Sequence, residues 1–375
     1  MKPFKCSTTA GAGLLTALLL SAPLLSAAAA QKPAFAPNPR LAGLPDNTAV
    51  ELGPFVWERA PGETCGGSVT DFGGMTYDMH NHRILLFGGG HSATDTDSLL
   101  SFDLSTLKWS ALYKPTPVKY LTKENLDNGF WKAGETGPYP RPASRHTYDL
   151  LVVPDDAAEL LMLRNGDYSM TQHAYYNSNC GVYDFKTGKW KVIPPQPFGG
   201  WGGVCEYDPI SKKVIGNAGN NGQGLFVFDP ATGKSQMILD DLIYKYKANG
   251  DSGTMVYCPV DRKMYVIQTN AQIWSIDLDR ANLRNSKIAV LQPSGEKPPG
   301  GECAYAYDAK NVLIGGGVKD NKFYAYDPAK NAWLSQNIQG AKPGTMTFHC
   351  LIYDPVDNVY VFIAGNKTYA YRWKR

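Results

Sequence analysis

The sequence predicts an all-β protein, a six-bladed β-propeller whose ring is closed by an N-terminal strand. The main observation is a phrase repeated six times along 375 residues: an apolar strand ending in Tyr-Asp-Pro or a relative, a polar turn, a second strand often closed by glycines, and a third strand ending in an aromatic-x-Asp step. A repeat of about 45–50 residues with four short strands is typical of one propeller blade. The third-strand acids are Asp103, Asp184, Asp229, Asp277 and Asp327, with Arg372 in that place in the sixth copy.

The first thirty residues have the pattern of a secretory signal peptide. Lys2 and Lys5 precede an apolar run from Gly11 to about Leu25, and small residues follow at Ala27–Ala30. We expect cleavage near Ala30 and a periplasmic or extracellular protein without membrane attachment. An uncleaved anchor is the alternative, although the run is Ala-rich and barely long enough to span a bilayer. Residues 31–48 are then an N-terminal extension and 49–375 a single propeller domain.

Charge and cysteine content narrow the functional classes. The formal net charge of +3 gives no basic face of the kind that nucleic-acid binding needs. Six of the seven cysteines lie beyond the leader, an even number that permits disulfides in an exported protein. Four of them lie in or beside first strands, where Cys also packs as a small hydrophobe, so the pairing stays open. Neither CxxC nor Cys/His metal spacing occurs; we expect a monomer without metal or cofactor.

The repeats fix the expected blade boundaries. Blade 1 has predicted strands at 75–78, 83–90, 99–103 and 108–112, and blade 2 at 146–153, 159–166, 181–184 and 189–193. Blades 3, 4 and 5 cover about 203–238, 254–291 and 302–335. Blade 6, at 349–373, has only three strands, and residues 54–59 are the predicted fourth because Trp57 matches Trp109 of blade 1. Such closure removes exposed sheet edges.

The longest insertion, residues 114–140, lacks the repeated phrase. Long connections of this kind are usually functional or disordered. Phe130, Trp131 and Tyr139 favour a packed loop that could serve as a lid.

Strand order places several polar and aromatic residues on one face. In a four-stranded meander, the loops after second strands and the loops between blades emerge on the same side, and they carry four of the six histidines. His80 and His82 fall in a turn on the opposite face, where we expect solvated side chains. Asp95 and Asp97 are expected to be solvated loop acids as well, because two carboxylates are too few for calcium.

Tyr148 and Arg164 form the most specific pair. Pairing Val153 with Glu159 across the turn of blade 2 puts Tyr148 directly opposite Arg164. A guanidinium lowers the pKa of a nearby phenol and offers two donors to a carboxylate. The structural alternative is a Tyr–Arg brace between blades.

The remaining candidates lie on the same predicted face. His91 follows a glycine cluster, and His349 opens blade 6, which lies beside blade 1. Tyr and Trp side chains could stack on sugar rings, or could pack under long loops. The catalytic candidates are His91, Tyr148, Arg164, His146 and His349, and the substrate-binding candidates are Arg145, Trp201, Tyr168, Tyr175 and Glu302.

The six phrases resemble those of kelch-repeat propellers of the galactose-oxidase-like superfamily. Among these, the chain is similar to secreted propeller polysaccharide lyases, which use His and Tyr from neighbouring blades and an Arg that neutralises a uronate carboxylate. The resemblance implies that His91, Tyr148 and Arg164 fill these roles, with His146 as a spare, although those lyases usually have seven repeats. Exported six-bladed sialate mutarotases offer a second comparison, but their motifs are not evident.

Two functions follow. The first is a lyase-like enzyme that cleaves an acidic polysaccharide or oligosaccharide by β-elimination, with Tyr and His as general acid and base. The second is a non-catalytic propeller that binds a glycan or a protein, with Trp201 and Tyr175 as anchors.

Overall fold

The computed structural model describes residues 34–374, apart from 91–92, 135, 165–166, 169–173, 176–177, 199–201, 218–223 and 241–251. The chain divides into two compact units, residues 1–32 and 33–375, and the described residues belong to the second. This unit is all-β, with one short α-helix, α1 (Pro39–Ala42), among its described residues. None of the described helices is long and apolar enough to cross a membrane.

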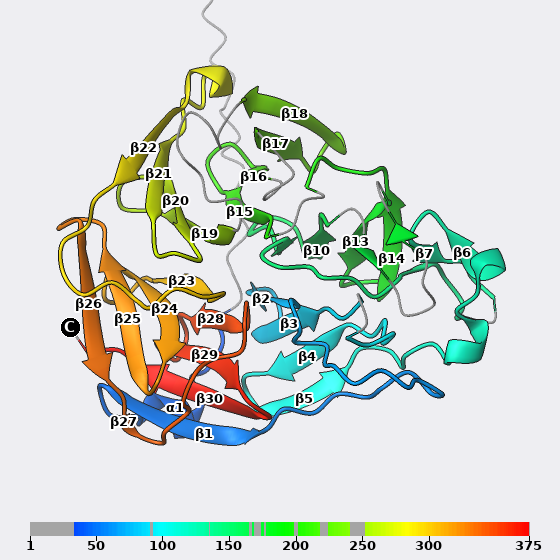
Figure 1. Cartoon of the computed structure of the whole chain (residues 1–375), viewed down its shortest axis with the longest axis horizontal. Helices are drawn as coiled ribbons and strands as arrows, with labels where there is room; N and C mark the ends of the chain where they lie inside the picture. The colour runs from blue at the N-terminus through cyan, green and yellow to red at the C-terminus, as the bar shows by residue number, and fades with distance from the viewer. Residues whose placement is uncertain are drawn as a thin grey trace, which may run out of the picture. The chain divides into compact units, whose positions relative to one another are not determined.

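Small antiparallel sheets form the second unit, as expected for a propeller (Figure 1). The first in chain order contains β2 (Gly74–Asp78), β3 (Arg83–Phe87), β4 (Leu100–Asp103) and β5 (Lys108–Ala111). The second contains β9 (Leu151–Val152), β10 (Glu159–Met162), β13 (Cys180–Asp184) and β14 (Lys189–Ile193). The third contains β15 (Val204–Asp208), β16 (Lys213–Asn217), β17 (Leu225–Asp229) and β18 (Lys234–Leu239).

The remaining large sheets repeat this order. The fourth contains β19 (Ser252–Cys258), β20 (Lys263–Gln268), β21 (Ile273–Asp277) and β22 (Lys287–Leu291). The fifth contains β23 (Tyr305–Asp308), β24 (Leu313–Lys319), β25 (Lys322–Asp327) and β26 (Ala332–Asn337). The sixth contains β28 (Leu351–Asp354), β29 (Val359–Ala364) and β30 (Lys367–Arg372), extended by β1 (Thr48–Pro54) and β27 (Gln339–Gly340).

An N-terminal strand does pair with β30, but the residues predicted for it were wrong. The strand is β1, in which Thr48 pairs with Arg372 and Pro54 with Lys367. Trp57 follows the strand, and the Arg59 guanidinium carbon lies 4.9 Å from the centre of its ring. Matching Trp57 to Trp109 therefore shifted the prediction beyond the true strand. Part of the expected extension is also folded, since α1 lies within residues 31–48.

The first strands of the six large sheets lie side by side. Each first strand contacts the next one. The contacting pairs are β2 with β9, β9 with β15, β15 with β19, β19 with β23, β23 with β28, and β28 with β2 (Figure 1). Apolar side chains pack between neighbouring large sheets. For example, Leu85 and Phe87 of β3 pack with Leu160 and Met162 of β10, all of them fully buried.

The repeated Asp residues are explained by the turns that follow them. Asp78 is fully buried at the end of β2, and its Oδ1 accepts the backbone N–H groups of His80 at 3.0 Å and Asn81 at 3.2 Å. At the end of β4, Asp103 accepts from Ser105 and Thr106 in the same way. These carboxylates accept hydrogen bonds from turn N–H groups that have no partner in the sheet. The repeated Asp residues therefore stabilise turns and do not indicate a catalytic or binding site.

The insertion is packed, as predicted. It forms η1 (Val118–Tyr120), η2 (Lys123–Asn125) and a sheet of β6 (Leu126–Asp127), β7 (Phe130–Trp131) and β8 (Arg141–Pro142). Trp131 is 1% exposed and packs with Leu121 and Ala143. Two further short strands, β11 (Asp167–Tyr168) and β12 (Ala174–Tyr175), pair within the loop after β10, and η4 (Leu283–Asn285) precedes β22.

The described cysteines are buried thiols. Cys65, Cys180, Cys205, Cys258, Cys303 and Cys350 are all free. Burial raises the pKa of the Cys180 thiol to about 12, and this thiol donates to the carbonyl oxygen of Leu163 at 3.1 Å. These side chains therefore pack as small hydrophobes, the alternative to disulfides that the sequence had left open.

Candidate functional site

Tyr148 and Arg164 are neighbours, as expected, but through a different register. Val152 of β9 pairs with Leu161 of β10, one residue out of the predicted alignment. Tyr148 lies before β9 with a φ of +48°, and its backbone N–H donates to the carbonyl of Phe72 at 2.9 Å. The Arg164 guanidinium carbon still lies 5.4 Å from the Tyr148 ring centre, within cation–π range.

Two histidines complete a cluster around Tyr148. His146 Nδ1 lies 3.4 Å from the Tyr148 phenol oxygen, and the His146 ring packs on Phe72 at 4.5 Å between ring centres. The His349 ring meets the Tyr148 ring edge-on at 5.7 Å. The structure thus brings together four predicted residues, Tyr148, Arg164, His146 and His349, which are 3–5% exposed. Phenol, imidazole and guanidinium together can move a proton beside a bound anion.

His349 is kept neutral by its surroundings. Burial lowers its pKa to about 4, and a hydrogen bond with the backbone of Gly253 opposes this only in part. Its Nε2 lies 4.0 Å from a carboxylate oxygen of Glu302, whose side chain is 29% exposed. Glu302 therefore connects the buried cluster to a more open surface. Above pH 4, His349 can accept a proton.

The stability of the protein should fall on acidification because of His349. Between about pH 6.5 and pH 4 the unfolded chain takes up a proton at this residue and the folded chain does not, so the free energy of unfolding decreases as pH falls. The loss is about 3 kcal/mol over this window. We expect His349→Gln to remove this part of the pH dependence, measured by urea unfolding at stepped pH. A variant with the pH slope of the wild type would contradict this.

Arg145 has a structural position. Its side chain is 1% exposed and donates to the carbonyl oxygens of Ala143, Arg164, Asn179 and Gly129. The guanidinium carbon also lies 5.6 Å from the Phe130 ring centre. A guanidinium committed to backbone carbonyls holds the insertion and the Arg164 segment in place. This geometry favours a structural role over the substrate contact expected from the sequence.

Two carboxyl groups that sequence reasoning did not select are Asp149, just before β9, and Glu206 of β15. Asp149 accepts the Met255 N–H of the fourth sheet at 2.7 Å, and its carbonyl accepts the Cys205 N–H of the third sheet at 2.9 Å. Burial raises the pKa of Asp149, and burial also raises the pKa of the half-buried Glu206 to about 7. Glu206 is therefore a candidate proton donor near neutral pH. For Asp149 the available signal was the polar run from Ser144 to Asp149 beside the first strand of the second sheet.

Four predicted residues are not placed by the structure. His91 and Trp201 lie outside the described residues. Tyr168 and Tyr175 are described only as backbone, in β11 and β12. Their predicted roles stay predictions.

The loop that begins after Gly90 is fixed to its surroundings from Ala93 onward. The expectation that Asp95 and Asp97 are solvated was wrong, since they are 4% and 0% exposed. Asp97 accepts the Thr116 N–H at 2.8 Å and its hydroxyl at 2.7 Å, which joins this loop to the insertion. These bonds supply partners that the sequence alone does not reveal.

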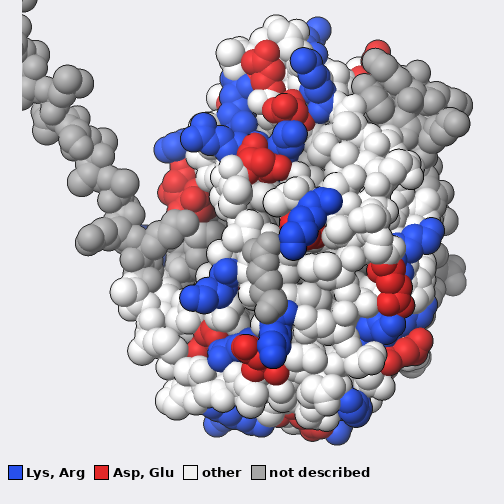
Figure 2. Space-filling view, turned by 90° about the vertical axis from the view of Figure 1, so that its left-hand side faces the viewer, with Lys and Arg blue, Asp and Glu red and all other residues white. Residues whose placement is uncertain are grey.

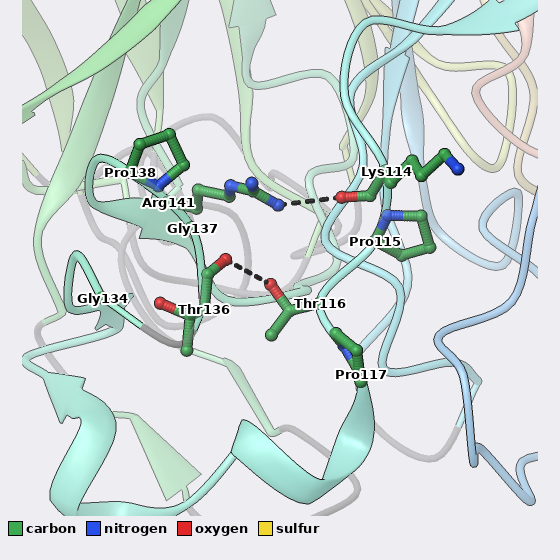
Figure 3. Close-up of a pocket in the computed structure, with 9 residues that line it drawn as sticks. All are labelled: Lys114, Pro115, Thr116, Pro117, Gly134, Thr136, Gly137, Pro138 and Arg141. Atoms are coloured by element: carbon green, nitrogen blue, oxygen red, sulfur yellow. Dashed lines mark hydrogen bonds between the residues drawn. The ribbon is translucent and has the colours of Figure 1, made fainter.

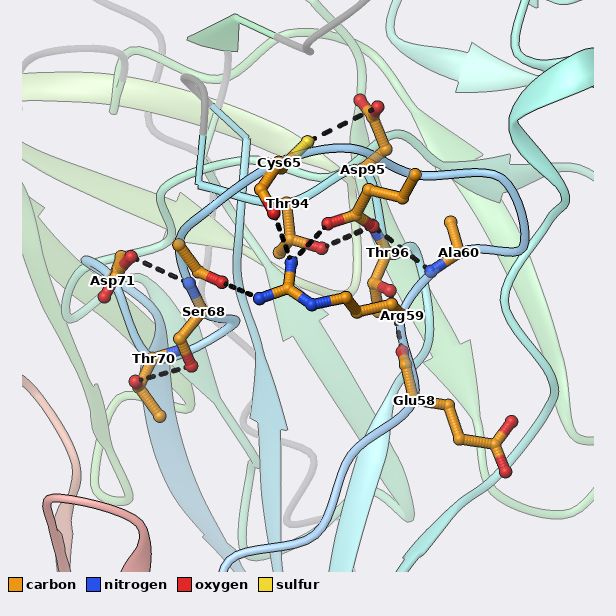
Figure 4. Close-up of polar contacts among 12 residues, drawn as sticks. Glu58, Arg59, Ala60, Cys65, Ser68, Thr70, Asp71, Thr94, Asp95 and Thr96 are labelled. Atoms are coloured by element: carbon orange, nitrogen blue, oxygen red, sulfur yellow. Dashed lines mark hydrogen bonds and ion pairs between the residues drawn. The ribbon is translucent and has the colours of Figure 1, made fainter.

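A polar network holds the other side of this loop (Figure 4). Glu63 accepts from the Arg59 guanidinium at 2.8 Å and from the Thr94 hydroxyl at 2.8 Å. Arg59 also donates to the carbonyl oxygens of Cys65 at 2.9 Å and Gly67 at 2.7 Å. The segment after β1 thus forms a rigid frame for the loop that follows β3.

A separate cavity of about 460 Å³ lies in the insertion (Figure 3). Arg141 donates across it to the carbonyl of Lys114 at 2.8 Å, and the Thr116 hydroxyl oxygen lies 3.1 Å from the carbonyl oxygen of Thr136. None of the described candidate site residues lines it. On the face shown in Figure 2, basic and acidic side chains are interspersed, without an extended patch of one sign among the described residues.

The comparisons with known proteins identify a fold but no family. No family model and no curated protein matches the chain. A Bacteroides thetaiotaomicron protein of unknown function aligns with a TM-score of 0.53 at 11% identity, over 86% of this chain and 75% of its own. The structure of YjhT aligns with a TM-score of 0.52 at 14% identity, over 83% of this chain and 95% of its own.

A third solved structure is described as an auxiliary nutrient binding protein from Bacteroides thetaiotaomicron. It aligns with a TM-score of 0.50 at 12% identity, over 90% of this chain and 74% of its own. At such low identity these likenesses concern the fold alone, an all-β arrangement of several sheets compatible with a propeller.

Proposed function

We propose that the second unit is a six-bladed, kelch-type β-propeller closed by β1, and that it is an exported lyase acting on uronic-acid-containing glycans. The cyclic contacts of the six first strands and the pairing of β1 with β30 support the architecture. The pattern of residues 1–30 supports export to the periplasm or the cell exterior.

The observation that carries the lyase proposal is the cluster of Tyr148, His146, Arg164 and His349. A uronate carboxylate bound by Arg164 makes the C5 proton more acidic, because neutralising the carboxylate stabilises the carbanion that forms. We assign Tyr148 as the phenolate and His146 as the holder of its proton, because the two side chains lie 3.4 Å apart and the Arg164 guanidinium lies 5.4 Å from the Tyr148 ring.

Tyr148 and His146 together account for every proton that is moved in the elimination. The Tyr148 phenolate takes the C5 proton, the C5–H electron pair forms the C4–C5 double bond, and the C4–O4 bond breaks. The leaving oxygen takes the proton held by His146. Transfer of the phenol proton from Tyr148 back to His146 then restores the starting state.

A substrate panel tests this proposal. Incubation with uronate polysaccharides, including rhamnose–glucuronate polymers, should give an unsaturated uronate, detected by ultraviolet absorbance and by mass. Absence of this product across the whole panel, with protein shown to be folded, would rule out the lyase.

A binding propeller is the second candidate, favoured by the burial of the four cluster residues at 3–5% exposure. One similar fold is described as a nutrient binding protein. Under this alternative, Trp201→Ala abolishes glycan binding while Tyr148→Phe leaves it intact. An uncleaved glycan retained by the protein would favour binding over lysis.

A further inference from the structure

A second polar cluster lies where the first and sixth sheets meet, and neither proposed function uses it. His82 comes from the turn between β2 and β3, while Asp354 ends β28 and Asp357 follows in the next turn. The three residues are 1%, 0% and 3% exposed. The expectation that His82 is solvated was therefore wrong, because the Phe35 ring stacks on it at 5.0 Å between ring centres and Asp354 of the sixth sheet lies beside it.

The three side chains point at one another. His82 Nε2 lies 3.2 and 3.3 Å from the two carboxylate oxygens of Asp354. One nitrogen or oxygen atom from each of the three residues lies within 4.8 Å of the others. Three potential ligand atoms thus converge from two sheets that are far apart in sequence.

Part of the hydrogen-bonding capacity of this cluster is unused. Asp357 Oδ1 accepts the Asn38 backbone N–H at 2.7 Å, but the buried Asp357 Oδ2 and His82 Nδ1 have no hydrogen-bond partner among the described residues. Arg372 lies near but donates to the backbone carbonyl of Asp357 and not to its carboxylate. Buried polar atoms without partners are unfavourable, so these atoms point to a missing ligand or proton.

The charges lead to the same conclusion. Asp354 and Asp357 are adjacent buried carboxylates, and two such groups repel when both are ionised. At another contact between sheets, Arg280 of the fourth sheet supplies the cation, donating to both oxygens of Asp208 at 2.9 Å. At the first-to-sixth contact there are two acids, and the side chains in reach are His82 and the uncharged phenol of Tyr77, which hydrogen-bonds to Asp354.

We propose that His82, Asp354 and Asp357 bind a divalent transition-metal ion that cross-links the first and sixth sheets. One imidazole nitrogen and two carboxylates suit Zn²⁺ or Mn²⁺, whereas Ca²⁺ needs six to eight oxygens. Because Asn38 is bonded to Asp357 and to the backbone of Leu104, the ion also fastens the N-terminal segment. The role is structural and independent of the lyase proposal.

Metal binding by the whole mature protein tests this. Chelator-treated protein titrated with Zn²⁺ or Mn²⁺ should bind one ion per chain by elemental analysis, and its Tm should rise. Asp357→Asn, which preserves the shape of the side chain, should weaken binding by more than about 10-fold and abolish the Tm rise. His82→Gln should do the same.

Two control variants show whether the bound ion belongs to this cluster. His80→Gln removes a histidine from the same turn, and Arg280→Gln weakens the other inter-sheet contact, so both variants should still bind one ion. Folded wild type that binds neither metal overturns the proposal and leaves a shared proton as the partner of the two acids. Folded Asp357→Asn with unchanged metal affinity also overturns it.

Discussion

Tyr148→Phe is expected to lower the rate of uronate elimination by about 10²- to 10⁴-fold, the range for loss of a general acid–base group. The substitution removes only the phenol oxygen. The ring keeps its packing on Phe72 at 5.8 Å, its edge contact with His349 and its position under Arg164. The loss should therefore appear in kcat, with KM and the free energy of unfolding nearly unchanged.

Tyr353→Phe is the matched control. Tyr353 is a buried tyrosine of β28 whose phenol contacts the Asn358 side chain at 2.8 Å, outside the cluster. Losing that hydrogen bond should decrease stability by about 1 kcal/mol without changing turnover. If folded Tyr148→Phe turns over as fast as the wild type, Tyr148 is not the base. The elimination would then need another group, and the lyase proposal would lose its central residue.

The repeated strand pattern could be predicted because its signal is local. Asp78 and Asp103 accept hydrogen bonds from backbone N–H groups only two or three residues away. A short stretch of sequence is therefore enough to identify each turn. Strands β3, β5 and β14 accordingly begin at the predicted residues. The second sheet departs from the pattern at its first strand, because Tyr148 adopts a φ of +48° and β9 is reduced to two residues.

The details of the site depend on contacts between distant residues, which alternation and spacing do not encode. Thr147 illustrates this: its hydroxyl donates to the Phe87 carbonyl at 2.5 Å and accepts the Gly74 N–H at 2.7 Å, joining the second sheet to the first. His82 is similar, since its partner Asp354 is 272 residues away. From the sequence alone, a polar residue in a turn or at the end of a strand is predicted to be exposed to solvent. Its burial becomes evident only when the position of the neighbouring sheet is known.

Arg145→Met is expected to have the largest effect on stability, a loss of about 3–5 kcal/mol in the free energy of unfolding. Methionine fills most of the volume but donates no hydrogen bonds. The buried carbonyl oxygens of Gly129, Ala143, Arg164 and Asn179 then lose a charged donor. Each buried acceptor left unsatisfied costs about 1–3 kcal/mol, and relaxation of the insertion recovers part of the total.

Urea unfolding of Arg145→Met beside Arg284→Met measures this effect. Arg284 is exposed, so its replacement should change stability by less than about 0.5 kcal/mol. If Arg145→Met lost less than about 1 kcal/mol, its carbonyl contacts would be dispensable, and a direct role with substrate would regain support. In a structural role, Arg145 acts on catalysis only through the Arg164 carbonyl that it holds at 3.0 Å. Activity should then fall in step with the unfolded fraction and recover at temperatures where the variant is fully folded.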